Sequence, residues 1–141
     1  MSTIAAPHRG QPLELILARN LVSSVRLAAF LVDADGHLAF YNEDAAAILG
    51  RQFEDIGRLP REQWNAEFGP LDDHDRPLPS DRLPLTIALR EGRPAFGQFR
   101  IRADQGVIDI EAGALPLVGP TGYQGAIVVL WPAPAVKNSS T

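Results

Sequence analysis

AAFLVDADGHLAFYNEDAAAILG, residues 28–50, places two short apolar runs on either side of an Asp-Ala-Asp-Gly turn and follows them with an alanine-rich segment. Asp35-Gly36 between two β-prone runs predicts a tight hairpin, because glycine accepts the positive φ that such a turn requires. Asn42 is a favoured N-cap for the segment behind it, and Gly50 suits the left-handed position that ends a helix. The stretch therefore predicts strands at 28–32 and 37–41 and a short helix at 43–49.

The rest of the chain supplies helices first and strands last. The remaining predicted elements are a leading helix at 12–26, an irregular segment at 51–79 with one helical turn near 61–66, a helix at 80–90 that Ser80 or Asp81 would cap, and strands at 95–103, 107–117 and 124–131. Such segregation predicts an α+β domain with an antiparallel sheet and helices on one face. The boundaries are a flexible leader at 1–11, one domain at 12–131 and a flexible tail at 132–141.

The composition is that of an ordinary globular domain. The chain has 141 residues, of which 45% are hydrophobic and 21% charged, so it can bury a real core. A net charge of −4 gives no electrostatic case for binding nucleic acid or an anionic membrane. The absence of cysteine excludes disulfides, thiolate zinc sites and cysteine nucleophiles. With no bilayer-length apolar run and no secretory signal, the sequence predicts a cytoplasmic protein.

The hairpin and its capped helix closely resemble the opening of a PAS domain, which runs strand, Asp-x-Asp-Gly, strand, Asn and a short helix ending in Leu-Gly. Later landmarks that also match a common PAS pattern are Arg-Pro-Leu-Pro at 76–79, Leu-Pro-Leu with Ala-Leu-Arg-Glu-Gly within 83–92, and Gly-x-x-Gly-Ala-Ile-Val-Val at 122–129. The resemblance extends from about residue 13 to residue 131. It implies a five-stranded antiparallel sheet, a leading helix, and a non-catalytic sensor or protein-interaction module in intracellular signalling. The Met1 start and the polar tail favour a small stand-alone protein.

The resemblance also bears on cofactors. Light-sensing flavin-binding PAS members use a cysteine for their photoadduct, and haem-binding members commonly ligate iron with a histidine on the longer helix. This chain has no cysteine, and residues 80–90 contain no histidine, so neither haem nor flavin is expected. A flavin without adduct chemistry or a small organic ligand between sheet and helices stays open. The candidate walls, which could equally just fill the core, are Phe40, Leu49, Trp64, Phe68, Ile87, Phe99, Ile101, Ile110, Ala112, Ile127 and Val129.

The leading helix carries more apolar surface than one sheet face can cover. At about 100° per residue its apolar side chains form an arc roughly 200° wide, about twice what a single sheet face requires. PAS relatives often pair through such a helix. We therefore expect a homodimer, besides a possible downstream signalling protein, with contacts at Leu13, Leu17, Leu21 and Val25.

Two acidic segments invite alternatives. Asp33-x-Asp35-Gly36 superficially resembles a calcium loop, but an EF-hand needs a bidentate Glu at position twelve, where this chain has Asp44; we expect a turn and no metal. The Asp72–His74 cluster could serve a small α+β enzyme if it lies inside a pocket, or be a solvated turn.

A third alternative is a purely structural dimerisation domain, which a core without any pocket would favour.

Overall fold

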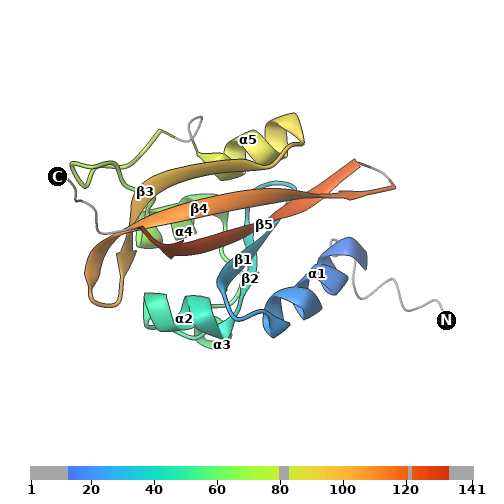
Figure 1. Cartoon of the computed structure of the whole chain (residues 1–141). Coiled ribbons are helices and arrows are strands. Elements are labelled where there is room, and N and C mark those ends of the chain that lie inside the picture. Colours follow the sequence, from blue (N-terminus) through green and yellow to red (C-terminus); the bar gives the residue numbers. More distant parts are fainter. Residues whose placement is uncertain (1–12, 80–82, 121, 134–141) are drawn as a thin grey trace.

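The computed structural model describes residues 13–79, 83–120 and 122–133. A five-stranded antiparallel sheet in the order β2-β1-β5-β4-β3 forms its centre, with the helices around it (Figure 1). The elements are α1 (Leu13–Ser24), β1 (Ala28–Asp33), β2 (Leu38–Tyr41), α2 (Glu43–Leu49), α3 (Phe53–Ile56), α4 (Arg61–Phe68), α5 (Pro84–Glu91), β3 (Ala95–Ala103), β4 (Gly106–Gly119) and β5 (Gly122–Pro132).

The predicted α+β fold with a five-stranded antiparallel sheet is confirmed, and the differences are element boundaries and one additional short helix. The strands β4 and β5 are longer than predicted, and the single expected helical turn is the full helix α4. The short helix α3 was not predicted. The leader at 1–11 and the proposed caps Ser80 and Asp81 lie outside the described residues, and the helix α5 begins at Pro84 after Leu83.

The two faces of the sheet carry different partners. Because residues paired across antiparallel strands point to the same side, the register places Phe30 with Val128 and Ala112 with Leu130 on one side, called here the inner face. Leu31 pairs with Phe40 and with Ile127 on the opposite, outer face. Trp64 of α4 stacks on Phe30, and α5 lies across the sheet from α1 (Figure 1).

The leading helix packs on the outer face. The guanidinium of Arg19 lies 4.4 Å from the centroid of the Phe40 ring, and Phe40 points away from the inner face. Leu15, Ala18 and Val22 are buried in the core; their i, i+3, i+7 spacing makes them one stripe of the helix. The described helices include none that is long and apolar enough to span a membrane.

The β1–β2 turn closes on the Asp33 side chain. One carboxylate oxygen of Asp33 accepts the backbone N–H groups of Asp35 and His37, both at 3.0 Å. Gly36 has φ +85°, a left-handed conformation that suits glycine. The acidic pair here organises a turn, as the hairpin interpretation expects.

Both edge strands of the sheet are bridged by single residues from the long connecting segment. On one edge, Leu38 of β2 exchanges two backbone hydrogen bonds with Leu59, at 2.9 and 3.2 Å. On the other edge, Arg100 of β3 exchanges two with Leu71, at 2.7 and 3.0 Å. The chain that follows α2 therefore wraps from one edge of the sheet to the other across the inner face.

Candidate functional site

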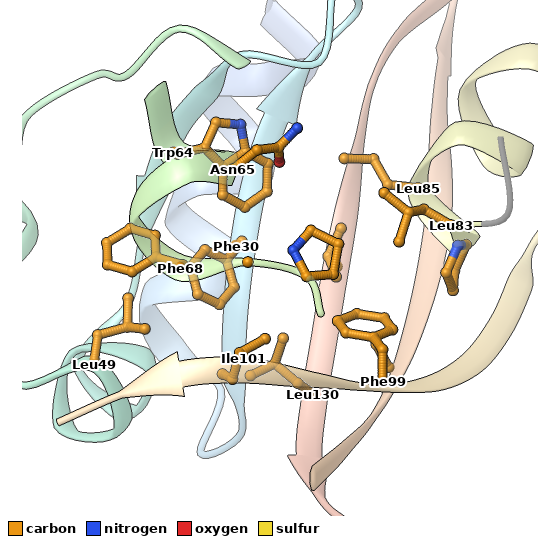
Figure 2. A pocket seen from close by; sticks show the side chains of 15 residues that line it. Phe30, Leu49, Trp64, Asn65, Phe68, Leu83, Leu85, Phe99, Ile101 and Leu130 are labelled. Carbon is orange, nitrogen blue, oxygen red and sulfur yellow. The ribbon is translucent and has the colours of Figure 1, made fainter. Parts of the chain in front are cut away.

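An apolar cavity of about 70 Å³ lies between the inner face and the segment that crosses it. Figure 2 shows the aromatic side chains of Phe30, Trp64, Phe68 and Phe99 converging on it from the sheet and from α4. The lining residues are Phe30, Leu49, Trp64, Asn65, Phe68, Gly69, Pro70, Leu83, Pro84, Leu85, Phe99, Ile101, Ala112, Val128 and Leu130.

The small residues of the sheet leave this space open. Ala112 on β4 is 1% exposed and pairs with Gly97 of β3 and Leu130 of β5, so the middle of the inner face carries little side-chain volume. The chain fills the rim instead, with α2 at one end and the start of α5 at the other. A cavity remains because the large side chains stand around the small ones.

Trp64 fixes the wall formed by α4. Its ring stacks on that of Phe30, with centroids 5.9 Å apart and planes inclined by 24°. Its indole N–H donates to the carbonyl oxygen of Gly36 at 3.1 Å. An aromatic ring with its polar atom satisfied is held in one position, so this wall is attached to the β1–β2 turn.

The structure brings six of the predicted wall residues together around the cavity and places five elsewhere. Leu49, Trp64, Phe68, Phe99, Ile101 and Ala112 line it. Phe40, Ile127 and Val129 lie on the outer face by register, Ile110 is fully buried and Ile87 half-buried, and none of the five is among the described lining residues.

Sequence reasoning missed nine lining residues, for two reasons. Val128 and Leu130 sit in the continuous apolar run of β5, where no alternation marks which side chains point inward. Gly69, Pro70 and Leu83 belong to irregular backbone, whose course no periodicity predicts. Phe30 of β1 pairs with Tyr41 of β2, and a register shift between Leu31 and Val32 keeps the turn at Gly36 from predicting that pairing.

The described wall of the cavity offers few partners for the polar atoms of a flavin and no ligand for haem iron. Asn65 contributes the one polar side chain among the described lining residues, whereas a flavin ring carries several polar edge atoms that need partners when buried. Haem iron takes an axial His, Cys, Met or Tyr, and the described wall has none of these. In the part of the chain that the structure describes, no three His, Asp or Glu side chains group as metal ligands.

Asn42 joins the leading helix to the helix at the end of the cavity. Its side-chain oxygen accepts the N–H groups of Ala45 at 3.0 Å and of Ala29 at 3.2 Å. Its amide group donates to the carbonyl oxygens of Val22 at 3.0 Å and of Leu27 at 2.9 Å. Asn42 is therefore the N-cap of α2, as the sequence predicts, and also the attachment point of α1. Gly50 ends the same helix with φ +80°.

The Asp72–His74 cluster is a surface turn away from the cavity. One carboxylate oxygen of Asp72 accepts the backbone N–H groups of His74 at 2.8 Å and of Arg76 at 3.0 Å, and these bonds lower the pKa of Asp72. The His74 and Asp73 side chains are 68% and 83% exposed. The enzyme alternative requires this cluster to lie inside a pocket, and these side chains lie on the surface instead.

Two of the four predicted contact residues, Leu17 and Leu21, lie on the exposed side of α1. Leu17 and Leu21 are 58% and 57% exposed. Val25 follows the helix and is partly buried. The side chain of Leu13 is not among those that the structure describes. Phe96 and Leu115 are also exposed, at 69% and 40%, and pair with Gly113 and Ile127 on the outer face. We call Leu17, Leu21, Phe96 and Leu115 the outer apolar surface.

Comparison with known proteins places this geometry in a fold. No protein-family model matches the chain, and no curated protein shows a significant sequence match. Among solved structures, the PAS domain of a protein from Colwellia psychrerythraea has a TM-score of 0.60 at 18% identity, covering 84% of this chain and 96% of that one. The RsLOV d2 variant has a TM-score of 0.67 at 18% identity, covering 89% and 70%.

A third similar structure is the PAS domain of nitrogen regulation protein NR(II) from Vibrio parahaemolyticus, with a TM-score of 0.59 at 13% identity and coverage of 83% and 98%. The matches span nearly the whole length of the Vibrio domain and of the Colwellia domain. The five-stranded antiparallel sheet and the capped helix after the first hairpin agree with the resemblance seen in the sequence. The chain has the PAS-domain fold.

Proposed function

We propose that the chain is a sensor module of the PAS type, which binds a small apolar molecule in the inner-face cavity and signals through protein contacts. The observation that carries the proposal is the cavity itself, lined by aromatic and aliphatic side chains with one polar neighbour, Asn65, among the described residues. The similar PAS and LOV domains support a sensing role. A cavity in the core lowers the stability of the fold, so we would expect a domain with a purely structural role to fill it.

The cavity limits the ligand by size and polarity. An engineered protein cavity of about 150 Å³ lined by aliphatic side chains stays dry and binds benzene or xenon; the present one is about 70 Å³. A ligand of a few non-hydrogen atoms without charge suits this wall. A charged group would lose its hydration with only Asn65 of the described wall to compensate.

The proposal includes a homodimer through the outer apolar surface. Covering one exposed Leu is worth roughly 1.5–3 kcal/mol when burial is complete. The four side chains are 40–69% exposed, so covering each contributes part of such an amount, and together those of two subunits can offset an association cost of about 4–15 kcal/mol. Asn42 supports a link between the two features, since it holds α1 and caps the helix whose Leu49 lines the cavity.

Xenon pressure with methyl-resolved NMR tests the cavity. We expect saturable shifts at Leu49, Ile101, Val128 and Leu130, because their methyl groups surround the space. Ala112→Leu should fill the cavity and abolish the shifts, whereas Ala47→Leu, the same change on an exposed position of α2, should leave them. If Ala112→Leu fails to fold, Leu130→Phe takes its place. Unsaturable shifts spread over the surface would contradict a ligand site.

A further inference from the structure

A second depression of about 520 Å³ opens on the surface where the β1–β2 turn, the start of α4 and the exposed side of α5 meet. Its described lining includes Asp35, His37, Arg61, Leu85, Leu89 and Arg90. Ligand pockets in proteins occupy about 300–1,000 Å³, so this groove has the size of a small-molecule site. Of these residues, Leu85 also lines the apolar cavity, which makes it the wall between the two spaces.

Two of the groove's side chains are cations that pair with no other described residue. Most described arginines are engaged: Arg51, Arg58, Arg76, Arg93 and Arg100 in ion pairs, Arg102 with a carbonyl oxygen and Arg19 on an aromatic ring. Arg61, Arg90 and Arg26 are the described arginine side chains with no such contact. Two of these three face the same groove, in a chain whose net charge is −4.

Contacts with His37 and Gly36 fix the position of Arg61 at the edge of the groove. The Arg61 backbone N–H donates to Nδ1 of His37 at 2.9 Å. The aliphatic stem of Arg61 lies over Gly36, where a Cβ would come within 3.1 Å of the Arg61 Cδ. Trp64 fixes the same turn through its bond to the Gly36 carbonyl. The absence of a side chain at Gly36 therefore leaves room for the arginine beside the turn.

The same contact sets the hydrogen-bonding capacity of His37. Because Nδ1 accepts from Arg61, the neutral ring carries its proton on Nε2 and donates there. The Thr86 hydroxyl on α5 adds a further donor, and Leu85 and Leu89 add apolar surface one helical turn apart. Among the described lining residues the one opposing charge is Asp35, whose carboxylate has no ion-pair partner in that part of the chain.

We propose that this groove binds a small organic anion, with a carboxylate or phosphate group held by Arg61 and Arg90 and its carbon skeleton against Leu85 and Leu89. Guanidinium groups recognise both anions through paired hydrogen bonds. The proposal is independent of the apolar cavity, which excludes charge; the two sites differ in lining and in ligand chemistry.

Titration of the full chain with citrate and with inorganic phosphate, followed by amide NMR at ionic strength held constant with sodium chloride, tests the proposal. We expect saturable shifts at His37, Arg61, Thr86 and Arg90 with at least one probe. Arg61→Gln and Arg90→Gln should each weaken its affinity about tenfold or more. Asp35→Asn should strengthen it, because it removes the repelling charge.

Arg26→Gln is the matched control. Arg26 is exposed and lies outside the groove, and its side chain, like those of Arg61 and Arg90, pairs with no described residue. The substitution should leave the affinity unchanged. Linear, non-saturating shifts with both probes would overturn the proposal, and so would an equal loss of affinity in Arg26→Gln and Arg61→Gln, because it would show attraction to charge alone. Circular dichroism of each variant confirms that it is folded before affinities are compared.

Discussion

The side-chain amide of Asn42 donates a hydrogen bond to the carbonyl oxygen of Val22 at 3.0 Å. Val22 lies in the last turn of α1, and Asn42 precedes the first turn of α2. A carbonyl in the last turn of a helix lacks an intrahelical partner, so one side chain completes the end of α1 and the beginning of α2. Asn42 is 4% exposed, and the four hydrogen bonds of its side chain are made within the protein.

Asn42→Ala should lower the free energy of unfolding by about 2–4 kcal/mol, more than the loss of an N-cap alone. The cap is worth roughly 0.5–2 kcal/mol, and buried carbonyls left without partners add about 1–3 kcal/mol. Urea denaturation followed by tryptophan fluorescence measures the change. Asn20→Ala, at an exposed position of α1, is the control and should change little; a loss under about 1 kcal/mol at Asn42 would show that its donor bonds carry no net stability.

Leu17→Glu combined with Leu21→Glu should convert a dimer into a folded monomer. Both side chains are more than half exposed, so the charges cost the isolated subunit little, while an apolar interface would have to bury them. Sedimentation velocity at micromolar concentration measures the change. Val107→Glu, an exposed apolar residue of β4 outside the outer apolar surface, should stay dimeric. A wild-type monomer, or a double variant that stays dimeric, would rule out this interface.

Tyr41 should ionise late and limit stability in alkali. Burial raises the pKa of Tyr41 to about 12 from an ordinary 10.0, and its hydroxyl donates to the Arg51 carbonyl at 2.7 Å. Since the folded state favours the protonated phenol, the stabilisation is fully present below pH 10 and is lost as the pH rises through about 12. In Tyr123→Phe, which leaves Tyr41 as the sole tyrosine, absorbance at the phenolate band follows this ionisation. A midpoint near the ordinary value in the folded protein would contradict the buried hydroxyl.

Gly125→Ala should be far more destabilising than Gly122→Ala. Both glycines have positive φ, +145° and +115°, so each substitution strains the backbone by about 1–3 kcal/mol. At Gly125 the added Cβ would also overlap the Val32 carbonyl oxygen, whereas at Gly122 nothing described lies within 4 Å. Thermal unfolding of the two variants isolates the backbone clash as their difference. Equal melting temperatures would show that β1 can move away from β5 at this point.

Local chemistry made part of this structure predictable. The turn at Gly36 and the cap at Asn42 depend on bonds within a few residues, so sequence alone carries them. The inward side of β5 could not be predicted, because Ile127, Val128, Val129 and Leu130 are all apolar and only pairing with β1 selects Val128 and Leu130 for the cavity. For the same reason the side of the sheet that α1 would cover depended on contacts distant in sequence, such as that of Arg19 with Phe40.

A similar limit applies near the end of the β4–β5 hairpin. The register shifts between Leu117 and Val118, and a bulge of this kind changes the side to which following side chains point. Tyr123 consequently reaches α5, where its hydroxyl occupies the space that a Cβ at Gly92 would need. Gly92 ends α5 in a left-handed conformation, with φ +69°. Its second role, making room for a tyrosine from the far strand, becomes visible in three dimensions alone.

The bridges of Leu59 to Leu38 and of Leu71 to Arg100 have a consequence for how copies of this domain meet. An open strand edge is a template on which another chain can extend the sheet, and this is a common start of aggregation. Here each edge strand already has one residue of its own chain hydrogen-bonded to it, Leu59 on β2 and Leu71 on β3. Extension of the sheet at Leu38 or at Arg100 would first have to displace the bridging residue, so each bridge protects one point of its edge strand.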